Sequence, residues 1–223
     1  MFNTELILKA FENCIFDQLC CDNYSHNILD QLDPAFLDNY FYDDGATKLV
    51  LISKEDDFVI KIPFTGEYEF GAWGEDGFYQ DEFYEFTGAK EPNGWDYCLV
   101  EVLEFQLALE GGLDKFFLET YPIGYVHGHP IYAQRKATMF NRQESAKRYS
   151  HEYIKSLYKQ CDSEHVACFN EYWIADFVSC YGMETFMKLA HHLDNNNICD
   201  LHGGNLGYVD GCPVIVDYAG YWD

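Results

Sequence analysis

The chain has 223 residues, of which 48% are hydrophobic and 18% aromatic, and its formal net charge is −24. This length suits one domain or one compact pair of lobes, and the apolar content can fill a core, which excludes a largely disordered chain. The strong negative charge argues against direct nucleic-acid binding, and it favours solubility, attraction of a basic protein partner or mimicry of a nucleic acid toward such a partner.

Signals for export or membrane insertion are not evident in the sequence. No apolar run reaches about 18 residues, and residues 1–5 lack the basic region of a secretion signal. Nine cysteines in this context indicate reduced thiols and a cytoplasmic location rather than disulfides. Zinc binding by Cys161, His165 and Cys168 is the alternative, but their spacing fits no common ligand pair, so structural thiols are favoured.

The first forty residues are expected to form a helical extension. Apolar residues recur on one face of 4–21, which predicts a helix. Ser25 is a candidate cap for a second, short helix, and Pro34 begins another helical turn.

The pattern then changes to β-structure. Short apolar strands at 48–52 and 58–62, joined by the polar turn 53–57, predict a hairpin. Residues 65–95 are rich in glycine, acidic and aromatic residues, and this composition predicts an irregular but ordered insertion.

The rest of the chain alternates between helices and hairpins. Residues 96–110 are predicted to form a helix ended by two glycines. Further elements follow in this order: a hairpin of 121–126 and 130–134, a mostly helical stretch over 143–194 with its clearest helix at 184–193, and a last hairpin of 206–209 and 214–216 turned at Asp210 and Gly211.

This order predicts an α+β fold with three parts. Residues 1–40 form the helical extension, 41–137 a β-rich lobe that carries the insertion 65–95, and 138–223 a reduced helical lobe.

Three oxygen-bearing side chains near the C-terminus form the pattern with the most chemical content. Asp200 lies in a loop after a helix, Asn205 follows in the same loop, and Asp217 follows an apolar strand. A loop carboxylate can orient an attacking hydroxyl and accept its proton, whereas amide and carboxylate oxygens can bind Mg²⁺ together with phosphate oxygens. An isolated Asp in a loop is usually a turn or capping residue, so the prediction depends on the joint pattern.

Two segments carry a resemblance to the protein-kinase-like superfamily. Residues 200–205, Asp-Leu-His-Gly-Gly-Asn, resemble its catalytic loop in the form found in aminoglycoside and related small-molecule phosphotransferases. Residues 217–220, Asp-Tyr-Ala-Gly, resemble the magnesium-binding Asp-Phe-Gly segment. Upstream, residues 59–61, Val-Ile-Lys, resemble the strand whose lysine holds the nucleotide phosphates.

The resemblance spans about residues 41–220 and implies a two-lobed kinase-like fold that uses ATP and Mg²⁺. It implies Asp200 as catalytic base, Lys61 as phosphate ligand, and Asn205 and Asp217 as metal ligands. Glu101 is the implied partner of Lys61, with Glu104 as the alternative. Residues 45–48 would cover the phosphates through Gly45 and Thr47, and 134–137 would pass beside the adenine through Gln134 and Lys136.

Several positions depart from the family pattern. The phosphate loop has one glycine where protein kinases usually have three, and Asp43 and Asp44 lie beside it. Cys199 stands where protein kinases carry an arginine. Only three residues follow Gly220, so we expect neither an activation loop nor peptide-binding helices. This pattern is typical of minimal kinase-like proteins of mobile elements and bacterial effectors.

The expected function is therefore transfer of the ATP γ-phosphoryl group to a hydroxyl of a protein acceptor. Two alternatives stay open. One is a pseudokinase-like acidic interaction or inhibitor protein of the mobile-element or phage type. The other is a kinase-like nucleotidyltransferase that binds ATP in the reversed direction.

Overall fold

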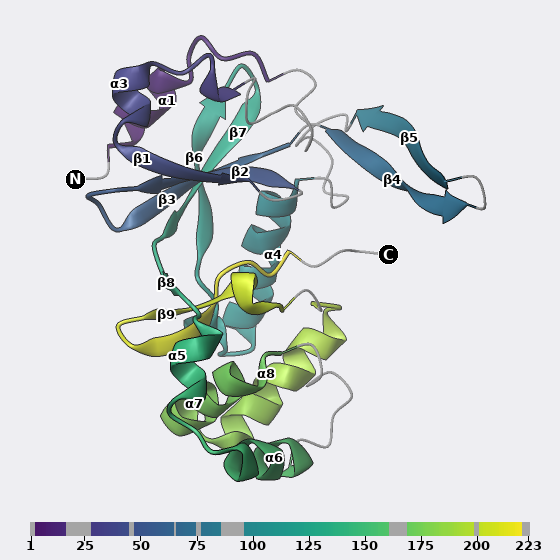
Figure 1. The fold of residues 1–223 in the computed structure, drawn as a ribbon. Helices are drawn as coiled ribbons and strands as arrows, with labels where there is room; N and C mark the ends of the chain where they lie inside the picture. Colours follow the sequence, from purple (N-terminus) through teal and green to yellow (C-terminus); the bar gives the residue numbers. More distant parts are fainter. Residues whose placement is uncertain are drawn as a thin grey trace. The chain divides into compact units, whose positions relative to one another are not determined.

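The computed structural model describes residues 3–16, 28–44, 47–64, 66–74, 77–85, 96–160, 169–198 and 201–219 (Figure 1). The fold is a mixture of helices and antiparallel sheets. The chain divides into two compact units. The first unit comprises Met1–Val100 and Thr120–Lys136, and the second comprises Glu101–Glu119 and Ala137–Asp223.

A five-stranded antiparallel sheet forms the first unit, with the strand order β1-β2-β3-β7-β6 (Figure 1). Both predicted hairpins are confirmed. The turn between β6 and β7 consists of His127 and Gly128, whose φ angles of 51° and 86° match the tight turn that a two-residue hairpin loop needs. The strands are β1 (Tyr40–Asp44), β2 (Lys48–Ser53), β3 (Phe58–Pro63), β6 (Thr120–Val126) and β7 (His129–Arg135).

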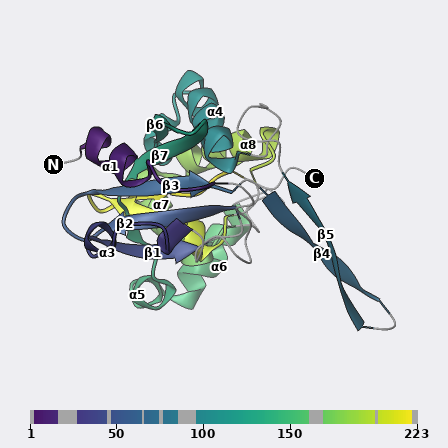
Figure 2. The same ribbon diagram turned by 90° about the horizontal axis from the view of Figure 1, so that it is seen from above.

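Two short helices border this sheet (Figure 2). Helix α1 (Thr4–Ala10) begins at Asn3, whose side chain accepts a hydrogen bond from Leu6 N, and packs against β6. Helix α3 (Pro34–Leu37) begins at Asp33 and packs against β1, as Pro34 predicted.

The prediction of a helix over 4–21 is wrong for residues 11–16. The chain leaves the helix at Phe11, and Phe11, Cys14 and Phe16 are all buried in the core of the first unit. Burial of these three side chains outweighs the helical periodicity of the segment, because tertiary packing routinely overrides local propensity. Residues 17–21 and Ser25 lie outside the described residues.

The prediction of an irregular segment over 65–95 is also wrong for much of its length. Strands β4 (Gly66–Gly74) and β5 (Gly77–Glu85) pair as a separate two-stranded antiparallel sheet. The register shifts between Tyr68 and Phe70 and again between Phe70 and Trp73. Aromatic residues favour strands, and glycine in a strand often marks such a shift, so the composition fits a bulged hairpin.

Helix α4 (Tyr97–Glu110) confirms the predicted helix and has a defined cap at each end. The Asp96 carboxylate accepts hydrogen bonds from Cys98 N and Leu99 N, both at 3.0 Å, and from the Tyr132 hydroxyl at 2.6 Å. At the other end, Gly112 has a φ of 67°, and Leu113 N donates to Ala108 O at 2.8 Å. This is the Schellman arrangement, which uses the glycine to turn the chain out of the helix.

The second unit contains the predicted helical stretch and the last hairpin, both of which are confirmed. Strand β8 pairs with β9, and β9 with β10. Asp210 and Gly211 form the turn with φ angles of 52° and 79°. The elements are η1 (Asp114–Phe116), β8 (Thr138–Met139), α5 (Arg142–Ala146), α6 (His151–Gln160), α7 (Glu171–Tyr181), α8 (Met183–Asn195), η3 (Gly203–Asn205), β9 (Leu206–Val209) and β10 (Cys212–Ile215).

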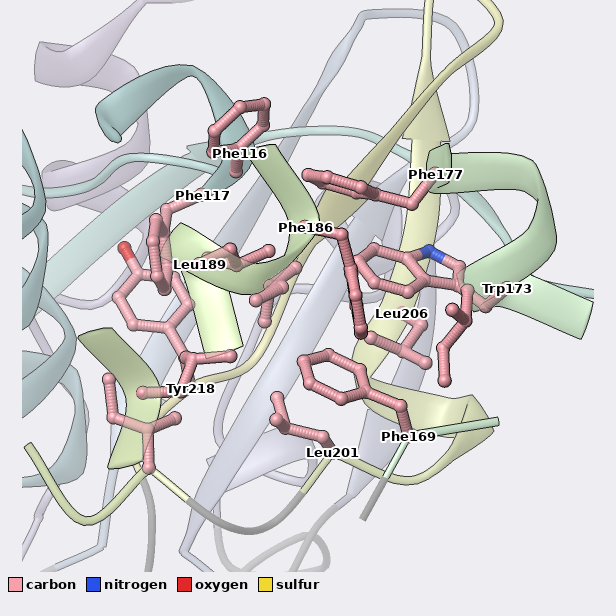
Figure 3. Close-up of a cluster of buried hydrophobic side chains, with 14 of the residues drawn as sticks. Phe116, Phe117, Phe169, Trp173, Phe177, Phe186, Leu189, Leu201, Leu206 and Tyr218 are labelled. Carbon is pink, nitrogen blue, oxygen red and sulfur yellow. The ribbon is translucent and has the colours of Figure 1, made fainter. Parts of the chain in front are cut away.

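An aromatic core holds these elements together (Figure 3). Trp173 of α7 is completely buried and stacks on Phe169 with ring centroids 5.3 Å apart. Phe177 of α7 meets Phe186 of α8 edge to face at 5.7 Å. Such aromatic pairs contribute about 0.5–1.5 kcal/mol each beyond the burial of their area. No helix among the described residues is both long and apolar enough to cross a membrane.

Candidate functional site

Lys61 lies in the middle of the sheet of the first unit. Strand β3 pairs with β2 on one side and with β7 on the other, and the Lys61 side chain is 3% exposed. Its ammonium donates to the hydroxyl of Thr120 at 3.4 Å. A buried ammonium needs polar partners, because transfer of a charge out of water is costly. The position therefore differs from that of a surface lysine at a strand edge.

Thr120 joins Lys61 to a second predicted site residue, Gln134. The Gln134 amide donates to the same Thr120 hydroxyl at 3.0 Å, and Gln134 is fully buried in β7. Two predicted nucleotide-binding residues thus meet in one buried polar cluster, which we call the Lys61 cluster (Lys61, Thr120 and Gln134). Sequence reasoning missed Thr120, because a threonine at the start of a strand carries no distinctive signal.

Lys136 is bonded to a different part of the first unit. Its ammonium donates to Ser53 O at 2.8 Å and to Asp56 O at 3.5 Å, and its backbone N–H donates to Asp57 O at 3.2 Å. These bonds give Lys136 a structural role in holding the turn between β2 and β3.

The predicted phosphate loop is described only in part. Thr47 precedes β2, and its backbone carbonyl accepts a hydrogen bond from Phe64 N at 3.0 Å. Gly45 lies outside the described residues. Glycine at the start of such a loop would allow close approach of backbone N–H groups to phosphate, but this part of the site stays a prediction.

Helix α4 carries two buried glutamates on one face. Glu101 is 0% exposed and Glu104 is 4% exposed, three residues further along the helix. Burial raises the pKa of Glu104 to about 7. Lys61 belongs to the first unit and both glutamates to the second, so the pairing of Lys61 with either glutamate stays a prediction.

Asn205 and Asp217 are brought together in the second unit by the hairpin of β9 and β10. Leu206 pairs with Ile215, so the residues just outside the hairpin are also neighbours. The backbone carbonyl of Asn205 accepts hydrogen bonds from Val216 N at 2.8 Å and from Asp217 N at 3.4 Å. The two predicted metal ligands, which flank one hairpin, are therefore adjacent along their backbones.

Local hydrogen bonds fix the backbone next to Asn205 and next to Asp217. Helix η3 begins at His202, whose Nδ1 accepts a hydrogen bond from Gly204 N at 3.0 Å, and Asn205 N donates to His202 O at 2.9 Å. After Asp217, the buried Tyr218 donates its hydroxyl hydrogen to Leu118 O at 3.0 Å. Asp200, the predicted base, lies outside the described residues.

The chemistry of this pair fits a hard cation. One amide oxygen and one carboxylate, with phosphate oxygens and water for the remaining positions, are the ligands that Mg²⁺ prefers. Among the described residues, no group of three or more His, Cys, Asp or Glu side chains could hold a metal ion. That finding does not bear on the pair of Asn205 and Asp217, because Asn205 carries an amide and Asp200 lies outside the described residues.

A buried carboxylate on helix α7 is hydrogen-bonded to the β9–β10 hairpin. Asp176 is 4% exposed and accepts hydrogen bonds from four side chains. These are Ser145 Oγ at 3.0 Å, Arg148 Nη2 at 2.8 Å, and the hydroxyls of Tyr149 at 2.7 Å and Tyr208 at 2.5 Å. Burial and, next, the bond to Asp176 raise the pKa of Tyr208 to about 12. Tyr208 belongs to β9, so the network fixes the strand that follows Asn205.

The sequence contains a signal for Asp176 that the motif reasoning missed. The residue stands alone as a charge in the apolar run Trp-Ile-Ala-Asp-Phe-Val of residues 173–178. A carboxylate inside a buried helical stretch needs several donors, so it indicates a polar network.

Comparisons with models of protein families, with curated proteins and with solved structures each found no significant match for this chain.

Proposed function

We propose that this chain is an ATP- and Mg²⁺-dependent phosphotransferase with a two-lobed kinase-like fold, which transfers the γ-phosphoryl group to a hydroxyl of a protein acceptor. The observation that carries the proposal is the adjacency of Asn205 and Asp217 at the base of the β9–β10 hairpin. Joint binding of one metal ion requires its ligands to lie close together, and the hairpin brings these two residues side by side.

The order of elements in the first unit gives a second line of support. In kinase-like enzymes the phosphate-binding lysine lies on the third strand of the sheet, and its glutamate partner on the helix that follows. Lys61 lies on β3, and α4 is the next helix among the described residues, with Glu101 and Glu104 on its buried face. The burial of Lys61 also provides the low-dielectric surroundings in which an ammonium binds phosphate strongly.

Each residue then has a distinct part in the reaction. Asn205 and Asp217 would hold Mg²⁺, which when bound neutralises charge on the β- and γ-phosphates. Lys61 would hold the α- and β-phosphates through charge-assisted hydrogen bonds. Asp200 would orient the acceptor hydroxyl and accept its proton as the oxygen attacks the γ-phosphorus. The net charge of −24 favours a basic protein as the acceptor.

Nucleotide binding tests the proposal directly. ATP with Mg²⁺ should raise the unfolding temperature of the full chain, because a ligand that binds only the folded state stabilises it by mass action. Asp217→Asn should lower the Mg²⁺-ATP affinity by about tenfold or more, since it removes the charged ligand. Asp210→Asn in the turn of the same hairpin is the matched control, and it should leave the affinity unchanged.

Lys61→Met provides an independent arm of the test. The substitution keeps the buried alkyl chain but removes the ammonium, so the ATP affinity should fall by about tenfold or more. Lys54→Met, at an exposed lysine of the β2–β3 turn, is its control. Because one nucleotide must engage both residues, loss at Asp217 with none at Lys61 would contradict the proposed binding mode.

Labelled ATP separates the remaining alternatives. Transfer from the γ-position to a protein acceptor supports phosphotransfer, whereas transfer from the α-position indicates a nucleotidyltransferase. An absence of both binding and transfer would replace the proposal with the contact-only, pseudokinase-like function.

A further inference from the structure

Strand β1 forms one edge of the five-stranded sheet, and among the described residues only β2 pairs with it. We call the side of β1 away from β2 the β1 edge. Lys54 N donates to Asn39 O at 2.9 Å, and these two residues continue the β1–β2 register by one position. Because antiparallel residue pairs alternate between hydrogen-bonded and non-hydrogen-bonded, Phe41 and Asp43 also bond to β2. The backbone N–H and C=O of Tyr42, which lies between them, therefore point toward the β1 edge.

The neighbouring strand pair gives the same assignment. Phe64 N donates to Thr47 O at 3.0 Å, and these residues continue the β2–β3 register. Every second residue of β2 from this point bonds to β3, and Leu51 is one of them. Leu51 is the residue opposite Tyr42 in the β1–β2 register. Since the backbone groups of Leu51 are directed to β3, those of Tyr42 are not used in the β1–β2 ladder and face outward.

The opposite edge of the same sheet has two features that hinder further pairing. Strand β6 contains Pro122, which has no N–H, and its register with β7 shifts between Pro122 and Gly124. Proteins protect sheet edges with such features against pairing with other chains. Strand β1 has no proline and an unbroken register with β2, so its edge is able to take up another strand.

The side chains that follow the first residue of β1 are open to solvent. Helix α3 contacts the start of the strand, where the ring centroids of Phe36 and Tyr40 lie 4.8 Å apart. Phe41 and Tyr42 are 61% and 62% exposed, and as adjacent strand residues they lie on opposite faces of the sheet. An incoming strand would therefore find an aromatic ring on each face of the β1 edge.

The charge along this edge favours a cationic partner. Asp38 and Asp43 are exposed, and residues 38–47 contain no Lys, Arg or His. The ammonium of Lys54 lies 5.0 Å from the centre of the Phe41 ring, so the chain itself already places a cation on this aromatic surface. Exposed carboxylates beside aromatic rings suit arginine or lysine, because these cations form ion pairs with carboxylates and lie over aromatic faces.

We propose that the β1 edge is an interaction site, where an extended segment of a partner protein rich in arginine or lysine adds to the sheet as a further strand. Its backbone would bond to Tyr42, and its cations would meet Asp43 and the aromatic rings. A second copy of this chain suits the edge poorly, since it would bring the same carboxylates and a net charge of −24. The edge carboxylates thus select against the chain itself and for a basic strand. The inference does not depend on the proposed phosphotransfer.

The test uses the full chain and a synthetic probe, a short peptide that alternates arginine and valine. Valine favours extended backbone, and the matched control alternates arginine and proline, which keeps the charge but lacks the N–H groups of a strand. The net charge of the protein attracts any cation, so the dependence on backbone pairing decides the test. The arginine–valine peptide should bind at least about tenfold more tightly than the control, and the amide exchange of Tyr42, read by NMR, should slow by about tenfold.

Variants of Tyr42 separate backbone pairing from side-chain contact. Tyr42→Pro removes the N–H that faces the β1 edge and breaks no bond to β2, so it should weaken binding of the arginine–valine peptide by about tenfold or more. Tyr42→Thr removes the same ring but keeps the N–H, and it should weaken binding less. The comparison of the two arginine peptides decides the question even if Tyr42→Pro does not fold.

The other outcomes overturn the proposal. They are equal binding of the two arginine peptides, unchanged amide exchange of Tyr42 in the bound protein, and equal effects of the two Tyr42 variants. Equally tight binding of a peptide with glutamate in place of arginine would remove the preference for a basic strand. Self-association of the unmodified chain that Tyr42→Pro abolishes would assign the β1 edge to a second copy instead.

Discussion

Removal of the Asp176 carboxylate should destabilise the second unit strongly. Asp176→Ala leaves four donors around a buried space, among them the hydroxyls of Tyr149 and Tyr208. Hydrogen bonds to a charged group contribute about 1.5–3 kcal/mol each, but their contributions are not additive. The substitution also removes the free-energy cost of burying the carboxylate, which offsets part of the loss. Arg148 is 52% exposed, so its bond contributes little. Breaking such a buried network costs about 3–5 kcal/mol.

Unfolding in urea, followed by circular dichroism, measures this loss, and amide exchange of α7 and β9 localises it. Glu184→Ala is the control. It removes a carboxylate from the neighbouring helix α8, where Glu184 is 87% exposed and its bond to Lys188 spans one helical turn. That loss should be small compared with the loss for Asp176→Ala, because both partners of the ion pair are exposed. A cost below about 1 kcal/mol for Asp176→Ala, with unchanged protection of α7 and β9, would refute the reasoning.

Three further predictions concern His129 and Gly124 of the first unit and Glu104 of the second. Burial lowers the pKa of His129 to about 4, below its ordinary 6.5, so its stabilisation is complete above pH 6.5 and is lost as the pH falls toward 4. The loss amounts to at most about 3 kcal/mol, and melting curves at several pH values should show a weaker acid dependence for His129→Phe, which keeps the stacking on Phe16. Burial raises the pKa of Glu104 to about 7, so the stability of the second unit should fall as the pH rises from 4.5 to 7. Glu104→Gln should abolish this pH-dependent loss of stability. Gly124→Ala should loosen α1, because the new Cβ would lie 2.5 Å from Leu8 Cδ1; faster amide exchange of α1 by about tenfold would agree, and unchanged exchange would not.

Turn chemistry made the hairpins predictable. His127 and Gly128, and likewise Asp210 and Gly211, have the left-handed backbone that two-residue loops require, and the flanking strands are short and apolar. Once the last turn is fixed, the register places Asn205 beside Asp217. That part of the candidate site therefore followed from local sequence.

Packing between distant segments was not predictable in the same way. The periodicity of the N-terminal segment fits a longer helix, yet the helix ends at Ala10 and Phe11 is buried in the core of the first unit. The same limit applies to Thr120 and Asp176, whose roles arise from partners on other elements. Short-range patterns specify turns and faces, whereas the identity of a partner depends on the fold as a whole.

The bond from Tyr218 to Leu118 has a consequence for biosynthesis. These residues are separated by 100 positions, and Ile215 pairs with the same segment through the bond from Leu118 N to Ile215 O. Until the last hairpin has been made, Phe117 lacks the ring of Tyr218, which it meets edge to face with centroids 5.0 Å apart. The core of the second unit is therefore expected to become complete only after the last hairpin has been synthesised.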